Sequence, residues 1–173
     1  MAVRRIVLLG EEVLREPGVE VDEFDDDLRK LVEDMLATMY YAEGIGLAAP
    51  QIGVSLRVCV LDLNDEDDPE AGRWVFVKPV IVEASDEVDK ASEGCLSIPE
   101  MEDVVTRSVR VTVRGFDTEG QAIEVEADGL LARALQHEID HLDGVLFIDR
   151  LSAYKRRALL KKWKKSQKEG AKG

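Results

Sequence analysis

Cysteines and long apolar runs are scarce in this chain, and each scarcity excludes a class of protein. Two cysteines among 173 residues are too few for a small disulfide-stabilised scaffold. No apolar run approaches the roughly 20 residues of a membrane-spanning helix, and the N-terminal run from Ile6 to Leu9 is too short for a signal-peptide core. We therefore expect a cytoplasmic protein with no membrane association, whose length fits one globular domain.

Positive charge is sparse in the first 150 residues and concentrated after them. The formal net charge of the chain is −13. Residues 151–173 carry nine Lys or Arg and one Glu, so this segment has a charge of +8 and residues 1–150 have −21. An acidic body with a basic end predicts an anionic partner for the end, whereas the body is a poor nucleic-acid binder.

Hydrophobic periodicity predicts three helices. The first opens at three acidic residues, Asp25 to Asp27, and carries apolar residues at helical spacing to about Met39. The second follows Asp128, a good N-cap, and runs to about residue 142. The third follows Ser152 and covers residues 153 to about 168.

Strands are predicted over residues 57–63, 74–83, 109–116 and 121–127, which are rich in Val and Ile or alternate apolar and polar residues. Cys59 lies in the first of them and is expected to act as a small buried hydrophobe. We expect a glycine-rich loop over 44–53 and an exposed turn over 64–72. Because the strands cluster between the helices, the order favours an α+β fold, mainly antiparallel, over a doubly wound parallel sheet.

Both histidines of the chain lie in the segment His137-Glu138-Ile139-Asp140-His141, on the second predicted helix. Positions i and i+4 share one helix face, so both imidazoles can bind one metal ion. Glu138 can then act as general base on an activated water. The alternative is two incidental histidines beside a solvated glutamate, but the spacing and the helical context favour the metal site.

A catalytic metal site usually needs a third protein ligand and one open position. No histidine follows His141, and the later acidic residues lie near the end of the chain. Cys95 is the candidate, because Gly94 beside it permits close backbone approach. On spacing alone, Cys95 is as well explained as an ordinary buried residue.

Three segments follow one another along the chain: Gly44-Ile45-Gly46-Leu47-Ala48-Ala49-Pro50-Gln51, Glu93-Gly94-Cys95-Leu96-Ser97 and Gln136-His137-Glu138-Ile139-Asp140-His141. They resemble the motifs of the peptide deformylase family, in the same order, and the likeness extends from about residue 13 to residue 151. It implies a metal-dependent hydrolase that removes the formyl group from the N-terminal formyl-methionine of new proteins and releases formate. Residues 1–152 would form the catalytic domain, with a central helix carrying the histidines, and residues 153–173 a basic C-terminal helix and tail.

The resemblance also implies residue roles. One divalent metal ion, Fe(II) in the first place and otherwise Ni, Co or Zn, would be bound by Cys95, His137 and His141. Glu138 would be the general base and acid. The side-chain amide of Gln51 and the backbone N–H of Leu96 would stabilise the oxyanion.

An extended formyl-peptide would bind backbone groups of the first two motifs, and the methionine side chain would enter a pocket beside the metal. Each of these roles has an alternative that stays open here. The glycines of the first motif would only permit positive φ, Glu93 would be a solvated charge, and the pocket residues would be ordinary core residues. Arg133 would contribute mainly its aliphatic stem. The implied substrate-binding residues are Ile45, Gly46, Gly94, Glu93, Leu130, Arg133 and Ala134, with His137.

Two positions depart from the family pattern: Glu102 stands where many members carry Arg, and Thr106 where many carry Pro. These departures weaken the expectation of a basic contact to the peptide beyond the methionine.

The C-terminal segment has an apolar stripe, Leu159, Leu160 and Trp163, within its basic residues. The helix either docks by this stripe and is otherwise solvated, or its basic face binds ribosomal RNA or protein near the nascent chain. A membrane surface is disfavoured by the charge of the body. We expect a monomer.

Two other functions are considered. A small zincin-type peptidase would cleave internal peptide bonds and would need neither Cys95 nor Gln51. A non-enzymatic ribosome-associated protein would keep its function after Glu138→Gln.

Overall fold

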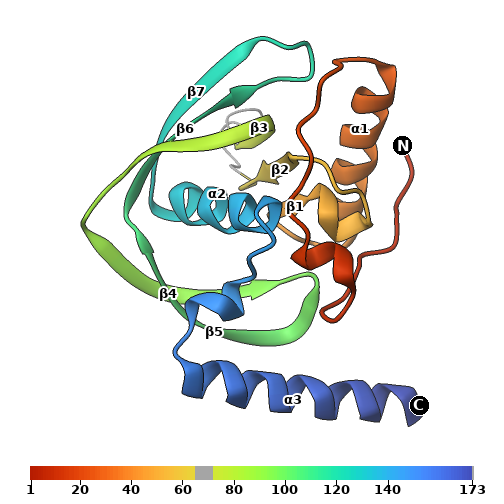
Figure 1. Ribbon diagram of the computed structural model, residues 1–173, viewed down its shortest axis with the longest axis vertical. Coiled ribbons are helices and arrows are strands. Elements are labelled where there is room, and N and C mark those ends of the chain that lie inside the picture. The colour runs from red at the N-terminus through yellow and green to blue at the C-terminus, as the bar shows by residue number, and fades with distance from the viewer. Residues whose placement is uncertain (65–71, 173) are drawn as a thin grey trace.

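The fold has three long helices and three short 3-10 helices, seen in a computed structural model that describes residues 1–64 and 72–172 (Figure 1). The turn expected over 64–72 therefore lies almost wholly outside the described residues. No helix in the described part is long and apolar enough to cross a membrane. The helices are α1 (Asp26–Tyr41), α2 (Gly129–Leu142) and α3 (Ala153–Lys172), with η1 (Glu12–Arg15), η2 (Ala49–Ile52) and η3 (Phe147–Arg150).

The strands are all antiparallel to their neighbours, as predicted for an α+β fold. Five form one sheet in the order β1-β2-β3-β6-β7, and two form a separate hairpin. The sheet strands are β1 (Gly46–Ala48), β2 (Val58–Asp62), β3 (Arg73–Ala84), β6 (Arg110–Phe116) and β7 (Ala122–Asp128), and the hairpin strands are β4 (Val88–Cys95) and β5 (Ile98–Ser108).

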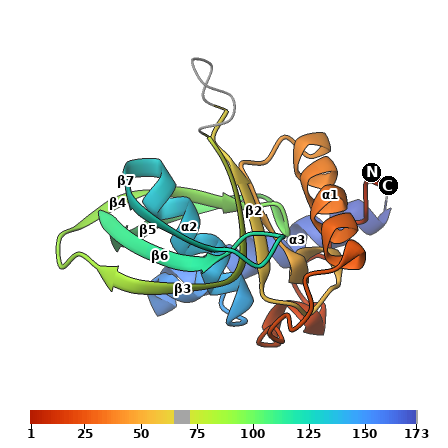
Figure 2. The same ribbon diagram turned by 90° about the horizontal axis from the view of Figure 1, so that it is seen from above.

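Helix α2 lies in the middle of the molecule, between the sheet and the β4–β5 hairpin (Figures 1 and 2). Its apolar side, with Leu135 and Ile139, belongs to the same buried cluster as Phe76 and Val113 of the sheet. Cys59 on β2 is in this cluster and fully buried, as its apolar strand predicted. The H-E-x-x-H segment is thus held on a helix fixed from both sides.

Two segments differ from the sequence-based expectation. The loop expected over 44–53 contains β1, which pairs with β2, and η2, which is followed by Gly53 with φ 81. The β4–β5 hairpin was not predicted, because β4 lacks apolar alternation: Glu93 is its one buried residue. Strand β4 is thus held by its pairing with β5 and by the contacts of Glu93, whereas β5 buries Ile98 and Val105.

The two outer helices begin where their capping residues predicted. The Asp25 side chain accepts a hydrogen bond from the Leu28 N–H at 3.0 Å, and the Ser152 hydroxyl accepts one from Lys155 at 3.2 Å. Helix α1 ends at Tyr41, two residues beyond Met39, and Glu43 then adopts φ 59.

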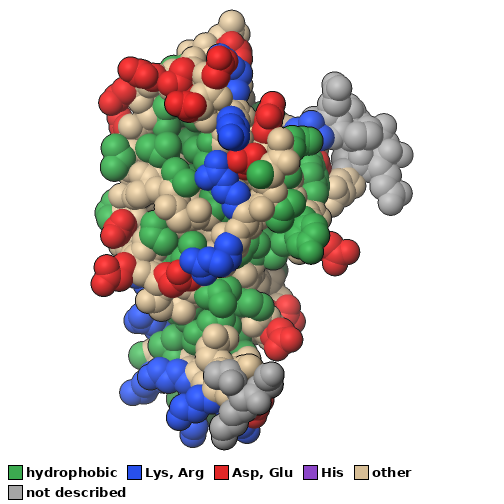
Figure 3. All heavy atoms as spheres, turned by 90° about the vertical axis from the view of Figure 1, so that its right-hand side faces the viewer, with side chains coloured by type: hydrophobic (Ala, Val, Ile, Leu, Met, Phe, Trp, Pro, Cys, Tyr) green, Lys and Arg blue, Asp and Glu red, His purple; other side chains and the backbone are tan. Residues whose placement is uncertain are grey.

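Helix α3 docks on the hairpin side of the molecule by its apolar stripe. Leu159 and Trp163 are buried in one cluster with Ile98 and Val105 of β5. Figure 3 shows Lys and Arg side chains gathered at the end of the molecule that α3 forms. The division of the chain at residue 152 stays a prediction.

Candidate metal centre

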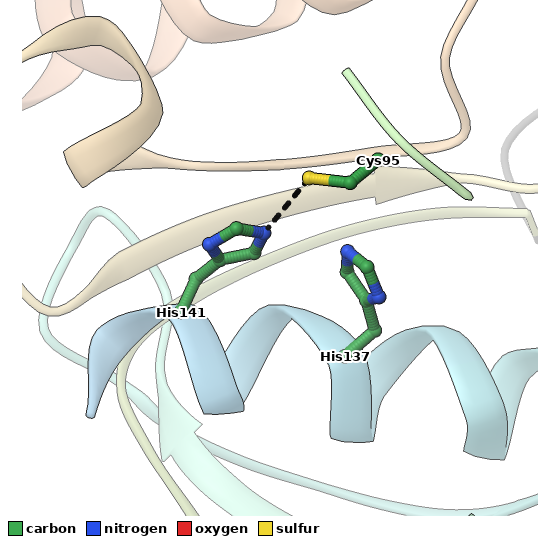
Figure 4. Close-up of side chains that lie close together, drawn as sticks. All are labelled: Cys95, His137 and His141. Atoms are coloured by element: carbon green, nitrogen blue, oxygen red, sulfur yellow. Dashed lines mark hydrogen bonds between the residues drawn. The ribbon is translucent and has the colours of Figure 1, made fainter. Parts of the chain in front are cut away.

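Helix α2 and the end of β4 bring the three candidate ligands together (Figure 4). His137 and His141 are one helical turn apart, and Cys95 reaches them from the hairpin. The Cys95 Sγ lies 3.3 Å from His141 Nε2, and the ligand atoms of all three residues lie within 4.8 Å of one another. The geometry therefore selects Cys95 as the third member of the group.

These atoms fit a divalent transition metal. A thiolate and an imidazole bound tetrahedrally to zinc would be about 3.6 Å apart, close to the spacing seen here. Burial lowers the pKa of His141 well below its ordinary value, which keeps its imidazole neutral. Neutral imidazole is the form that binds a metal.

Glu93 orients one of the two histidines. Its Oε1 lies 3.0 Å from His137 Nδ1, which leaves Nε2 of that ring for the ligand group. Arg107 donates two hydrogen bonds to the Glu93 carboxylate, both at 2.9 Å. Burial opposes ionisation of Glu93, but the hydrogen bonds from Arg107 and His137 outweigh it and lower its pKa to about 2. Glu93 is therefore a fixed buried anion and not a solvated charge.

A buried ion network extends from Glu93 behind the ligands. Arg107 also donates to Asp140 at 2.6 Å, and Asp140 accepts from Arg150 at 2.7 Å. Sequence reasoning missed Arg107 and Arg150. A signal existed for Arg107, because it follows the apolar Val105 by two residues and so faces inward on the same strand.

Glu138 lies within this group and is almost fully buried. Its Oε1 is 3.8 Å from His137 Nε2, and its Oε2 has no hydrogen-bond partner in the described part of the chain. Burial raises the pKa of Glu138 to about 7. A carboxyl with this pKa can both accept and donate a proton near neutrality.

The first-motif glycines are needed for close packing. A Cβ at Gly46 would lie 3.0 Å from the Glu138 carboxyl carbon, and one at Gly44 would lie 2.7 Å from a Leu96 methyl. Neither glycine has positive φ, whereas Gly53 does. The alternative that these glycines only permit positive φ is therefore wrong for Gly44 and Gly46.

Gln51 points its side chain toward the ligand group. Its Oε1 accepts a hydrogen bond from the Ala48 N–H at 2.9 Å, which fixes the orientation of the amide. The opposite end, Nε2, donates to the Ser97 hydroxyl at 3.2 Å and lies 3.5 Å from the Cys95 Sγ. The amide N–H groups are thus held beside the candidate metal position.

A cavity of about 580 Å³ opens over these residues. Leu130 is 55% exposed at its edge, so core packing does not explain it, and Ala134 is buried. The Arg133 guanidinium donates hydrogen bonds to Glu93 and Asp89, so the aliphatic part of its side chain is the part that lines the cavity. Every residue predicted for the site lines this cavity, His141 excepted: Ile45, Gly46, Gln51, Glu93, Gly94, Cys95, Leu96, Leu130, Arg133, Ala134, His137 and Glu138.

An α+β fold whose central H-E-x-x-H helix meets a hairpin cysteine defines a class of small metalloenzymes. The family model described as polypeptide deformylase matches residues 3–157. The chain belongs to this family.

Individual relatives match over nearly the whole chain. A peptide deformylase of Brucella suis is 50% identical over 165 residues, 95% of this chain and 94% of the relative. A crystal structure of a peptide deformylase from Legionella pneumophila is 44% identical, covers 99% of both chains and has a TM-score of 0.90. The Ehrlichia chaffeensis peptide deformylase, in complex with actinonin, is 39% identical over 96% of this chain and 98% of its own, with a TM-score of 0.89.

Proposed function

We propose that the protein is a peptide deformylase, which hydrolyses the formyl group from the N-terminal formyl-methionine of nascent proteins. Water adds to the formyl carbon, the C–N bond breaks, and formate and a free amine are released. The observation that carries this proposal is that the three ligands, the Gln51 amide and Glu138 lie together beside one cavity. In the described part of the chain, one Glu138 oxygen has no hydrogen-bond partner. Membership of the family supports it.

Cys95, His137 and His141 would hold one divalent metal ion, Fe(II) in the first place, with Ni, Co or Zn as substitutes. When bound, such an ion is a Lewis acid that polarises a carbonyl and lowers the pKa of water. The donor set supports this assignment, because thiolate and imidazole ligands suit these metals.

Different residues of the chain would carry out the proton transfers and the stabilisation of charge. Glu138 takes a proton from the attacking water and delivers it to the leaving nitrogen, for which its pKa of about 7 is suited. The Gln51 amide and the Leu96 backbone N–H stabilise the negative charge that develops on the formyl oxygen. Losing one such donor typically costs about 10²–10³ in rate.

The substrate would lie as an extended chain between β1 and β4. Backbone groups of Ile45, Gly46 and Gly94 would pair with it, in the manner of an added strand. The Ile45 carbonyl already accepts a hydrogen bond from the Asp62 N–H, so its N–H is the group left for the peptide. The methionine side chain would contact Leu130, the stem of Arg133 and Ala134, while Glu93 holds Arg133 in place.

The test is formate release from formyl-Met-Ala-Ser by protein purified without oxygen and loaded with Fe(II) or Ni(II). We expect rapid release by the wild type and loss of release when a chelator removes the metal. Glu138→Ala should keep the metal and lose the activity, whereas Cys95→Ala should lose both, as measured by metal analysis. Cleavage of internal peptide bonds without formate release would instead establish the zincin-type peptidase.

We also propose that the protein works as a cytoplasmic monomer near the ribosome. The candidate ligands and the cavity lining are complete within one chain, so a monomer would hold a whole site. The docked stripe of α3 leaves its basic residues outward, which supports binding to ribosomal RNA or protein. Co-sedimentation with ribosomes should weaken steeply with salt and after replacement of Lys161, Lys162 and Lys165 by Glu.

A further inference from the structure

The N-terminal segment, residues 2–9, binds both motifs that carry the proposed oxyanion donors, and the proposed mechanism does not use it. The Val7 N–H donates a hydrogen bond to the Gln51 carbonyl at 2.7 Å. The Leu9 N–H donates one to the Ser97 carbonyl at 2.9 Å. Gln51 carries one of the proposed donors, and Ser97 directly follows the residue that carries the other. One short segment thus joins the backbones of the first two motifs.

The orientation of the Gln51 amide depends on these two backbone positions. Its side-chain oxygen accepts a hydrogen bond from a backbone N–H of β1 at 2.9 Å, and its nitrogen donates to the Ser97 hydroxyl at 3.2 Å. These bonds fix the amide only if the backbones of Gln51 and Ser97 stay in place. The N–H groups of Val7 and Leu9 hold those backbones, so they also set how the Gln51 amide lies relative to the Leu96 N–H.

The segment is itself held at both ends. Near its start, the N–H and the guanidinium of Arg4 donate hydrogen bonds to side chains of α1. At its end, Leu8 and Glu11 close a turn: the Glu11 N–H donates to the Leu8 carbonyl at 3.1 Å, and the Glu11 carboxylate accepts from the Leu8 N–H at 2.7 Å. Gly10 in this turn has φ 108. Between the two ends, the Val7 side chain is buried. The segment can therefore act as a fixed support.

We propose that Val7 and Leu9 are positioning residues, whose N–H groups hold the Gln51 amide and the Leu96 N–H in the arrangement that stabilises the oxyanion. This inference rests on the proposed deformylase function. Both donors must reach one developing charge, and a misplacement of about 1 Å can cost about 10²-fold in rate. Neither Val7 nor Leu9 lines the cavity, so each acts through the motif that it binds.

The test removes the two N–H groups one at a time, by Val7→Pro and by Leu9→Pro. Leu9 is the second residue of the turn that Leu8 and Glu11 close, where the φ of Pro is favoured, so Leu9→Pro should fold. We expect kcat of the metal-loaded protein for formyl-Met-Ala-Ser to fall by about tenfold to 10²-fold in each variant, with metal content unchanged.

The matched control is Val3→Pro, which makes the same substitution in the same segment. The Val3 N–H makes no hydrogen bond in the described part of the chain, and its side chain is 52% exposed. This variant should keep the wild-type kcat. Equal losses of kcat in Val7→Pro and Val3→Pro would overturn the inference.

A double-mutant cycle separates positioning from general damage to the fold. If Val7 acts through Gln51, Val7→Pro should lower kcat by about twofold or less once Gln51 is replaced by Ala. If Val7→Pro causes its full loss of kcat in the Gln51→Ala background as well, Val7 does not act through Gln51.

Two measurements on the zinc-loaded protein need no turnover. In the wild type, the Val7 and Leu9 amides should be protected from hydrogen exchange and the Val3 amide should not, so equal exchange at all three contradicts the proposal. If the wild type releases no formate, the deformylase function itself fails. The NMR signals of the Gln51 side-chain amide then still decide, because they should shift in Val7→Pro and not in Val3→Pro. Signals unchanged in both variants would show that the segment does not position the amide.

Discussion

Gly46 and Glu138 show how one missing side chain shapes the candidate site. The Glu138 carboxyl occupies the space where a Cβ of residue 46 would lie. Because Glu138 is buried among the ligands, it has little room to move away. The position of the proposed proton carrier thus depends on a residue 92 positions earlier, in a different element.

Replacement of Gly46 by Ala should therefore displace Glu138. We expect kcat to fall by about tenfold to 10²-fold, because small displacements of a catalytic group are costly. The metal content should stay unchanged, since the three atoms nearest to a Cβ at Gly46 all belong to Glu138 and none to a metal ligand. Formate release at saturating substrate and metal analysis measure the two effects.

Gly170→Ala is the control for this substitution. No atom lies within 4 Å of the position where its Cβ would be, and α3 tolerates Ala better than Gly. It should keep full activity. Equal losses of activity in both variants would show that Glu138 is not positioned through Gly46.

At the scale of elements, the buried ion network joins the β4–β5 hairpin to α2. Arg107 on β5 bridges Glu93 on β4 and Asp140 on α2, and its side chain is 4% exposed. Strand β4 lacks an apolar pattern, so this polar network is a main contact between that strand and the helix. Through Glu93 it also orients His137.

Arg107→Leu should destabilise the fold and weaken metal binding. Removing one partner of a buried charge cluster costs about 3–5 kcal/mol. Losing the group that orients a ligand typically lowers metal affinity by about 10–100-fold. Urea unfolding of the metal-free protein and competition with a coloured chelator measure these quantities separately.

Arg110→Leu gives the comparison on the next strand. Its side chain is 60% exposed and pairs with the exposed Glu87, so its loss should change stability by no more than about 0.5 kcal/mol. If Arg107→Leu unfolds at the same urea concentration as Arg110→Leu, the network does not hold the hairpin.

At the scale of the whole molecule, the buried Asp34 carboxylate of α1 binds the N-terminal segment through hydrogen bonds. Asp34 accepts hydrogen bonds from the Ala2 N–H at 2.8 Å and from the Arg4 guanidinium at 2.7 Å. The Arg4 N–H donates to the Thr38 hydroxyl at 2.9 Å. The Ala2 N–H and Arg4 lower the pKa of Asp34 below its ordinary value.

This pKa gives stability a defined pH dependence. The folded state keeps Asp34 charged where the unfolded chain, with a pKa near 3.9, begins to bind a proton. The contribution is therefore present above that unfolded pKa and is lost as pH falls through the lower folded pKa. Asp34→Asn should cost about 1.5–3 kcal/mol at pH 7 and flatten the loss of stability in acid.

Urea unfolding between neutral pH and about pH 3 measures this effect. Asp86→Asn, at an exposed position, should keep the wild-type slope with pH. An unchanged slope in Asp34→Asn would mean that the acid sensitivity of the protein arises elsewhere.

The sequence by itself determined the features that depend on local spacing. Helical pitch places His137 and His141 on one face wherever α2 lies, and capping residues mark the starts of α1 and α3. The apolar pattern identified β2, β3, β6 and β7 and their antiparallel α+β arrangement. The basic charge of the last segment is likewise a property of composition.

Only the tertiary structure decided the features that join distant segments. Cys95 and His141 are 46 residues apart, and their contact exists because the hairpin folds over α2. The hairpin itself and the partners of Arg107 escaped sequence reasoning for the same reason. Strand β4 follows no apolar period, and the spacing of Val105 and Arg107 predicts an inward side chain but not its partners. Long-range ion pairs and strand pairing therefore fix these features rather than a local pattern.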